Sequence, residues 1–194
     1  MIPIQVIIQA SDSTQCSELA KQALQAGCKW IQLQTSQIED AENTARKLQQ
    51  LCHEHQATFI LGSNVESCKL INADGVCLTE SDPPANEVRE LLGHEYIIGA
   101  TAQTFEQIKL LKRMSADYIC LSLSQDSLAN LATITQQLAN EEIRIPLCVQ
   151  STSTDIHHIF KILNDGANGI ALSSNVLQPA NLKQTIQQLL YADE

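Results

Sequence analysis

The chain of 194 residues is long enough for one domain with a single core, and its formal net charge of −10 argues against a nucleic-acid partner, which would need clustered Lys and Arg. Hydrophobic residues make up 44% and charged residues 18%, no apolar run reaches membrane-spanning length, and no basic segment precedes the first apolar residues. We therefore expect a cytoplasmic protein that binds neither membrane nor nucleic acid. Seven cysteines without a CxxC pair favour reduced core thiols over disulfides.

Strands and helices are predicted to alternate along the whole chain. A strand at 4–10 precedes a helix that ends at 26, and a strand at 30–34 precedes a helix at 39–55. The next pairs are 58–61 with 64–71, 75–78 with 83–93, 96–100 with 104–114, and 118–123 with 128–140. The last pairs are 146–150 with 155–164 and 169–172 with 180–191. The strands are near-continuous apolar runs, which is typical of a parallel sheet covered by helices.

One phrase, which closes a helix and opens the next strand, occurs four times, at 26–33, 72–78, 115–121 and 166–172. The Leu residues that end it are 45, 43 and 51 residues apart, which leaves room for two β-α units in each interval. Four double units predict a single-domain (β/α)8 TIM barrel over 1–194, in which an active site lies in the loops that follow the strands. A flavodoxin-like or Rossmann sheet usually has five or six strands, and no GxGxxG follows the first strand here.

The segments that follow the eight predicted strands contain mostly hydroxyl and amide side chains. They contain no Lys, Arg or His, whereas several carboxylates lie in or beside them: Asp12, Glu80, Asp82, Asp126 and Asp155. This composition excludes a Schiff-base lysine, a histidine base and an arginine clamp for phosphate at the predicted site.

Four segments carry a resemblance to a known family: Trp-Ile-Gln-Leu-Gln (30–34), Ala-Asp-Gly-Val-Cys-Leu-Thr-Glu-Ser-Asp (73–82), Ile-Gly-Ala-Thr (98–101) and Gly-Ala-Asn-Gly-Ile-Ala-Leu-Ser-Ser (166–174). Over nearly its whole length the chain resembles the thiamine-phosphate synthase family, which includes a thiazole tautomerase branch. The resemblance implies a role in thiamine biosynthesis: a transferase that couples a pyrimidine diphosphate to a thiazole phosphate, releases pyrophosphate and uses Mg²⁺.

The chain departs from the family pattern at most charged positions. Gln34 and Ser36 stand where the family has Arg and Lys, and the loop at 123–128 is short and has no Lys. Gly62-Ser63 replaces an Asn-Asp pair, so one metal carboxylate is missing, whereas the second is retained as Asp82. Thr101 begins a Thr-Ala pair where the family has Ser-Thr. Residues 151–153 stand where the family has Gly-Gly, and Leu123 stands near the position of the His in the tautomerase branch. The family's Ser after the last strand is retained as Ser174.

The resemblance yields a set of candidate site residues. The candidates for binding a phosphorylated heterocycle are Gln32, Gln34, Thr101, Ser151, Thr152, Ser173 and Ser174, and the candidate Mg²⁺ ligand is Asp82. We expect the hydroxyls after the last two strands to hold a phosphate, and at most one of the two glutamines to face inward in mid-strand. The alternatives are helix capping for Asp82 and the serines, and a buried structural amide for each glutamine.

Three functions remain open on these residues. The chain is a diverged thiamine-phosphate synthase, a non-catalytic barrel that binds a thiamine-related metabolite or a partner protein, or a different enzyme on the same scaffold. The missing cations favour loss of the synthase reaction, whereas the resemblance favours assignment to the thiamine-phosphate synthase family. A homodimer is compatible with the sequence, and no segment specifies its interface.

Overall fold

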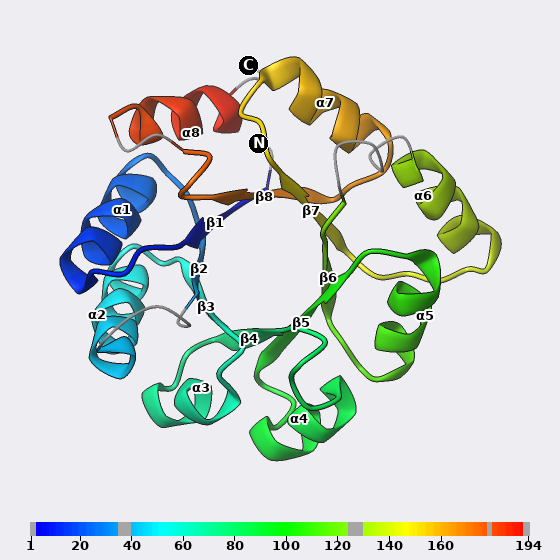
Figure 1. Cartoon of the computed structure of the whole chain (residues 1–194), viewed down its shortest axis with the longest axis horizontal. Coiled ribbons are helices and arrows are strands. Elements are labelled where there is room, and N and C mark those ends of the chain that lie inside the picture. Colours follow the sequence, from blue (N-terminus) through cyan, green and yellow to red (C-terminus); the bar gives the residue numbers. More distant parts are fainter. Residues whose placement is uncertain (1–2, 35–39, 124–129, 178–179, 192–194) are drawn as a thin grey trace.

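The computed structural model describes residues 3–34, 40–123, 130–177 and 180–191, which form a closed barrel of parallel strands surrounded by helices (Figure 1). The strands are β1 (Ile4–Ile8), β2 (Trp30–Gln34), β3 (Thr58–Gly62), β4 (Gly75–Leu78), β5 (Ile97–Ala102), β6 (Tyr118–Leu121), β7 (Leu147–Ser151) and β8 (Gly169–Ser173). The helices are α1 (Ser13–Gln25), α2 (Ala41–Glu54), α3 (Val65–Ile71), α4 (Ala85–Leu92), α5 (Phe105–Arg113), α6 (Leu131–Asn140), α7 (Ile156–Asn164) and α8 (Leu182–Leu190). Each strand pairs with the next and β8 pairs with β1, which confirms the predicted (β/α)8 barrel.

The predicted strands and helices agree with the structure to within a few residues. β1 ends at Ile8, two residues before its predicted end, because the N–H of Gln9 donates to the side chain of Ser174 instead of a neighbouring strand. The predicted starts of two helices, at 39 and 128, lie outside the described residues. The hydrophobic pattern therefore located every element, and the ends depend on side-chain contacts that the pattern does not encode.

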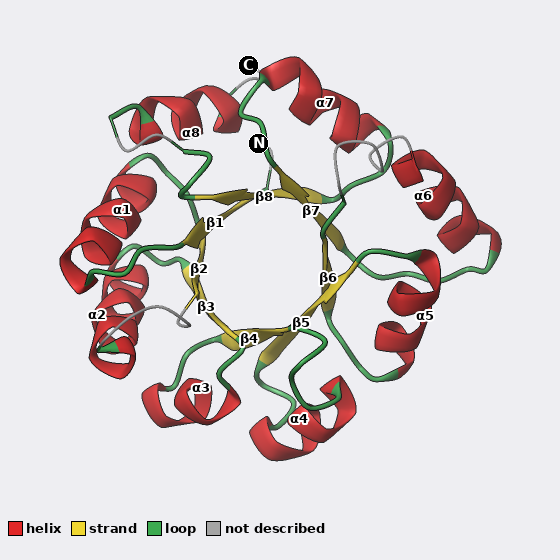
Figure 2. Cartoon of the chain, in the orientation of Figure 1, coloured by secondary structure: helices red, strands yellow, loops and turns green. Residues whose placement is uncertain are grey.

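The outward faces of the strands pack against the helices and form the main core (Figure 2). The fully buried side chains of this layer on the strands include Val6, Ile8, Ile31, Leu33, Phe59, Leu61, Val76, Ile98, Ile119, Leu121, Val149, Ile170 and Leu172. Alternate residues point into the barrel, so both faces of each strand are removed from water, which explains the apolar runs in the sequence. No helix in the described part of the chain is long and apolar enough to cross a membrane.

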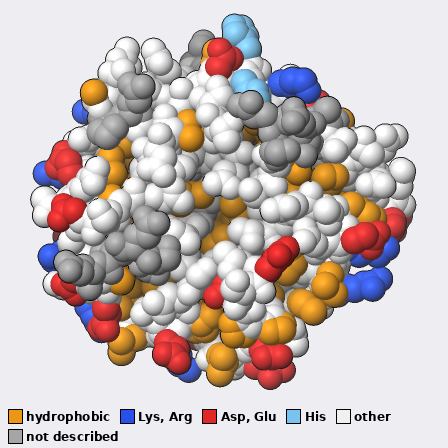
Figure 3. Space-filling model, in the orientation of Figure 1, with side chains coloured by type: hydrophobic (Ala, Val, Ile, Leu, Met, Phe, Trp, Pro, Cys, Tyr) orange, Lys and Arg blue, Asp and Glu red, His pale blue; other side chains and the backbone are white. Residues whose placement is uncertain are grey.

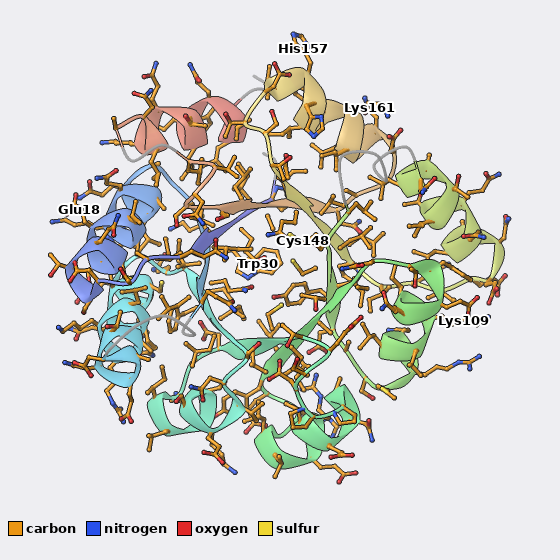
Figure 4. All side chains as sticks on the ribbon, viewed as in Figure 1. Glu18, Trp30, Lys109, Cys148, His157 and Lys161 are labelled. Atoms are coloured by element: carbon orange, nitrogen blue, oxygen red, sulfur yellow. The ribbon has the colours of Figure 1, made fainter. Side chains whose placement is uncertain are left out.

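The inside of the barrel holds a second and smaller cluster, made of Ile7, Ile60, Cys77, Tyr118, Cys120, Cys148 and Ala171. Branched aliphatic side chains usually fill such barrels, whereas three thiols and a phenol share the space here. The ring of Tyr118 lies over Gly99, where a Cβ atom would come within 2.2 Å of the ring carbon Cζ. Trp30 packs edge-on against Tyr118, with ring centroids 4.9 Å apart. Figure 4 shows Trp30 and Cys148 within the ring of strands, whereas Lys109 and Lys161 project from the helices.

All seven cysteines are free and buried, as the sequence predicts. Burial raises the pKa of Cys28 to about 11 and that of Cys52 to about 12, because a thiolate is poorly solvated in the core. These thiols therefore stay protonated at neutral pH and behave as small apolar side chains.

The repeated phrase has a structural cause at the amino ends of the strands. The side chains of Asp74 and Asp117 accept hydrogen bonds from the backbone N–H groups of Phe59 and Ile98, each at 2.7 Å. Asn168 accepts in the same way from the N–H of Leu147, at 2.8 Å. Each polar residue thus ties the start of one strand to the start of the preceding strand. The phrase serves the fold and lies at the end of the barrel opposite the predicted site.

Candidate functional site

The carboxyl ends of the strands surround a mouth whose flanking segments carry no cationic side chain. Figure 3 looks onto this end and shows a hollow in the middle, with Lys and Arg side chains at the outer edge and acidic side chains on its lower side. The sequence of every segment that follows a strand lacks Lys, Arg and His, including the two segments at 35–39 and 124–129 that lie outside the described residues. The retained charges near the mouth are therefore negative, which disfavours a multiply charged anion there.

The candidate serines at the end of β8, Ser173 and the next residue Ser174, are bonded to Gln9, which follows β1. Ser173 donates to Gln9 Oε1 at 2.6 Å and accepts from the N–H of Asn175 at 3.1 Å. Ser174 donates to the backbone oxygen of Gln9 at 3.0 Å and accepts from its N–H at 2.9 Å. The structure thus brings Ser173 and Ser174 together, and both hydroxyl protons are already used to close the barrel between β8 and β1.

The hydroxyl of Ser151 is also engaged within the protein. Ser151 is 1% exposed, donates to the backbone oxygen of Ser153 at 2.8 Å and accepts from its N–H at 3.1 Å. Thr152 is exposed at the following position. The N-terminus of α7 is capped by Asp155, whose Oδ1 accepts from the N–H of His158 at 3.0 Å; this bond lowers the pKa of the Asp155 carboxyl. A carboxylate therefore occupies the end of α7 where a phosphate would gain from the helix N–H groups.

Both candidate glutamines on β2 face into the barrel, contrary to the expectation that one at most would do so. Residues two apart on a strand share a face, and Gln32 pairs in register with Ile60 of the interior cluster. Gln32 is 5% exposed, and its Oε1 accepts from Gln5 Nε2 at 3.2 Å. Gln34 lies nearer the mouth and folds over Gly62, where a Cβ atom would be 2.2 Å from Gln34 Oε1. The absence of a side chain at Gly62 therefore makes room for the Gln34 amide.

Asp82 closes a turn after β4. Its Oδ2 accepts from both the N–H and the hydroxyl of Thr79, each at 2.7 Å. The residue that precedes α4 is Pro84, so Asp82 does not cap that helix as the alternative interpretation expects. Asp82 and Thr101 line the same cavity of about 320 Å³, and the Thr101 hydroxyl donates to the backbone oxygen of Leu78 at 3.2 Å.

The carboxylates near this cavity supply one of the two Mg²⁺ ligands that the resemblance implies. Proteins commonly hold Mg²⁺ by one or two carboxylates together with substrate phosphates. Glu80 lines the same cavity and accepts from Gln107 Nε2 at 2.6 Å, and Gly62-Ser63 after β3 offers no carboxylate. Within the described ranges, no group of three or more His, Cys, Asp or Glu side chains could hold a metal ion. Asp82 alone remains, and one of its oxygens is shared with Thr79.

Three further glutamines face the mouth or lie beneath it, and the sequence reasoning did not select them as site residues. Gln9 and Gln150 follow the interior residues Ile7 and Cys148 by two positions, so their side chains share the inward face. Gln5 is fully buried below Gln9 on the same face of β1. The signal was present in the sequence, because polar residues at 5 and 9 interrupt an otherwise apolar strand at a spacing that keeps them on one face.

Comparisons with known proteins identify the family. The family model described as thiamine monophosphate synthase matches residues 4–176. A thiamine-phosphate synthase of Bacteroides fragilis is 34% identical, over 98% of this chain and 99% of that protein, and one of Phocaeicola vulgatus is 35% identical, over 91% of each. The solved structure of a thiamine phosphate pyrophosphorylase from Pyrococcus furiosus covers 97% of the chain with a TM-score of 0.82 at 23% identity, which shows a shared fold. The chain therefore belongs to the thiamine monophosphate synthase family.

Proposed function

We propose that this protein acts in thiamine biosynthesis as a diverged synthase-type barrel that binds an uncharged heterocycle of the pathway in its mouth. We further propose that it catalyses the coupling of a pyrimidine diphosphate to a thiazole phosphate far more slowly than a family synthase does. Membership of the family supports the pathway role. The observation that carries the second part is that the serine hydroxyls expected to bind phosphate already donate within the protein, beside a mouth without cations.

The size of the effect follows from the two missing cations. A hydrogen bond to a charged group contributes roughly 1.5–3 kcal/mol, so an Arg and a Lys on a departing diphosphate supply about 3–6 kcal/mol. Since about 1.4 kcal/mol corresponds to a factor of ten in rate, their replacement by Gln34 and Ser36 lowers the coupling rate by roughly 10²- to 10⁴-fold. The described residues do not compensate, because the nearby carboxylates Glu80 and Asp82 would repel the leaving group.

The amides of the mouth suit a polar ring without a phosphate. Gln32 and Gln34 project inward from β2, and Gly62 on the neighbouring strand makes room for the Gln34 amide. Amide side chains recognise nitrogen heterocycles through paired donors and acceptors, as Asn and Gln do with adenine. We propose that these two glutamines contact the ring, and that Thr101 and Ser173 line the mouth without binding phosphate.

Other chemistry on this scaffold has less support from the mouth. A hydrolytic or proton-transfer enzyme needs a base within reach of the substrate. Asp12 caps α1 through the N–H of Gln15, and Glu80 accepts from Gln107, so both carboxylates already hold hydrogen bonds within the protein. The proposed binding of a neutral heterocycle uses the amides of the mouth, and no step of it is routed through Mg²⁺.

Calorimetric titration tests this proposal. We expect the neutral thiazole and pyrimidine alcohols to bind more tightly than their phosphate or diphosphate esters, and pyrophosphate with Mg²⁺ to bind weakly. The variant Gln34→Arg should raise affinity for pyrophosphate and leave the binding of the alcohols within a few-fold, and Gln32→Ala should weaken the alcohols. Micromolar binding of pyrophosphate by the unmodified protein would overturn the proposal.

A further inference from the structure

A buried glutamine on β1 connects the barrel interior to the mouth. Gln5 is fully buried, and each end of its amide has a partner: Nε2 donates to Gln32 Oε1 at 3.2 Å and to the Tyr118 hydroxyl at 3.3 Å, and Oε1 accepts from the Cys148 thiol at 3.9 Å. Burying an amide is unfavourable unless its groups are hydrogen-bonded, and apolar residues usually fill this layer of a barrel. Gln5 and its three partners therefore form one network, which joins strands β1, β2, β6 and β7.

The chemistry of the partners fixes the direction of each amide. Burial raises the pKa of both Cys148 and Tyr118, so both keep their protons at neutral pH. The Cys148 thiol donates to Gln5, which turns the oxygen of Gln5 toward β7 and its nitrogen toward β2 and β6. The oxygen of Gln32 must then face the nitrogen of Gln5. The amide of Gln32 cannot rotate by half a turn without placing two NH₂ groups against each other.

The remaining end of Gln32 is its NH₂ group. Within the described part of the chain this group donates to no other residue, and Gln32 retains a small exposed area of 5%. Gln34 lies two residues nearer the mouth on the same face, and its amide lies over Gly62 of the neighbouring strand. A ring that enters past Gln34 therefore meets a hydrogen-bond donor at the inner end of the hollow.

We propose that Gln5 is a positioning residue, which holds the Gln32 carboxamide with its NH₂ group toward the mouth. The mouth then selects a ring whose inner edge carries a hydrogen-bond acceptor, such as an aromatic ring nitrogen without a proton. The ligand class is a neutral nitrogen heterocycle with a free acceptor edge. This inference rests on the proposed binding of a heterocycle in the mouth and adds which edge of the ring faces inward.

A double-mutant cycle tests the coupling between the two glutamines. Calorimetry with a neutral thiazole alcohol should show that Gln5→Met and Gln32→Ala each weaken binding by roughly 2- to 10-fold, the size of one hydrogen bond. The double variant should bind no more weakly than Gln32→Ala alone, since Gln5 acts through Gln32. The matched control is Gln22→Met on α1, which removes an exposed bond to Glu18 and should leave affinity unchanged.

Two outcomes overturn the inference while the proposed function stands. In the first, Gln5→Met changes the affinity for the thiazole alcohol by less than twofold but lowers the melting temperature. This result would assign Gln5 a purely structural role. The other is equally tight binding of the matching thiophene alcohol, a neutral ring that lacks the acceptor nitrogen.

A ligand-free measurement keeps the two proposals apart. If the unmodified protein binds neither heterocycle, the proposed function fails, and the side-chain amide resonances of Gln32, assigned with Gln32→Ala, still report its orientation by NMR. We expect Gln5→Met to shift these resonances and to speed the exchange of their protons with water. Unchanged resonances would overturn the role of Gln5.

Discussion

The variant Asp117→Ala tests how strongly the repeated phrase stabilises the barrel. Asp117 Oδ2 accepts from the N–H of Ile98 at 2.7 Å and from Arg89 Nη2 at 2.5 Å. The Arg89 side chain is 11% exposed and also donates to the backbone oxygens of Gly93 and Tyr96. Removal of the carboxylate leaves the Ile98 N–H without its acceptor and the Arg89 charge without its counter-ion.

The expected cost follows from these two losses. A hydrogen bond to a charged group contributes roughly 1.5–3 kcal/mol, and the ion pair adds less than about 1 kcal/mol because Asp117 is 48% exposed and screened by water. Asp117→Ala should therefore lower the free energy of unfolding by about 2–4 kcal/mol. Asp117→Asn keeps an acceptor for the Ile98 N–H and should cost about 1–2 kcal/mol.

Urea unfolding at neutral pH measures these differences, with Asn168→Ala as a matched variant. Asn168 accepts from the Leu147 N–H through a neutral oxygen, so its loss should cost about 1 kcal/mol, less than the loss of Asp117. A change below about 0.5 kcal/mol for Asp117→Ala, or equal effects for all three variants, would refute the reasoning that the charged acceptor stabilises the start of β5.

Three further predictions concern the core and the mouth. The free energy of unfolding should fall as the pH rises above 9, because the thiols of the unfolded chain ionise near pKa 9.0 whereas burial raises the pKa of Cys28 to about 11 and that of Cys52 to about 12. Each of these two thiols should lower the free energy of unfolding by about 1.4 kcal/mol per pH unit in this range. Urea titrations at pH 7.5 and 10.5 measure the difference, and equal stability at the two pH values would contradict the prediction. Gly99→Ala should lower the free energy of unfolding by roughly 1–3 kcal/mol because its Cβ meets the Tyr118 ring, and an unchanged melting temperature would contradict this packing. Ser151→Ala should not change phosphate affinity in calorimetry, because this hydroxyl is bonded within its own loop, and a clear loss of affinity would show that it binds the anion.

The order and type of the elements could be predicted because burial imposes a period on the sequence. Strands such as β4 and β8 are covered on both faces, so their sequences are apolar runs. The repeated phrase recurs because a backbone N–H near the start of the preceding strand needs an acceptor, which Asp74 and Asp117 supply. The lack of cations at the mouth could also be predicted from the sequence, because it depends only on which residues follow the strands.

The roles of the individual polar residues could not be predicted in the same way. Ser174 and Ser151 occur in segments that suit phosphate, yet their hydroxyls bond to the backbone of Gln9 and Ser153 once the chain folds. Asp82 has a metal ligand's chemistry, and its carboxylate is instead held by Thr79. Hydrogen-bond partners depend on loop geometry and on strands distant in sequence, so no local pattern identifies them.

The reaction of the family tests the central claim most directly. A pyrimidine diphosphate and a thiazole phosphate are incubated with the protein and Mg²⁺, and thiamine phosphate is measured beside an active family synthase at equal concentration. The account predicts turnover at least about 100-fold slower than that of the control, as the loss of two cations requires. Turnover equal to that of the control would contradict it, because a mouth without cations would then support the release of pyrophosphate.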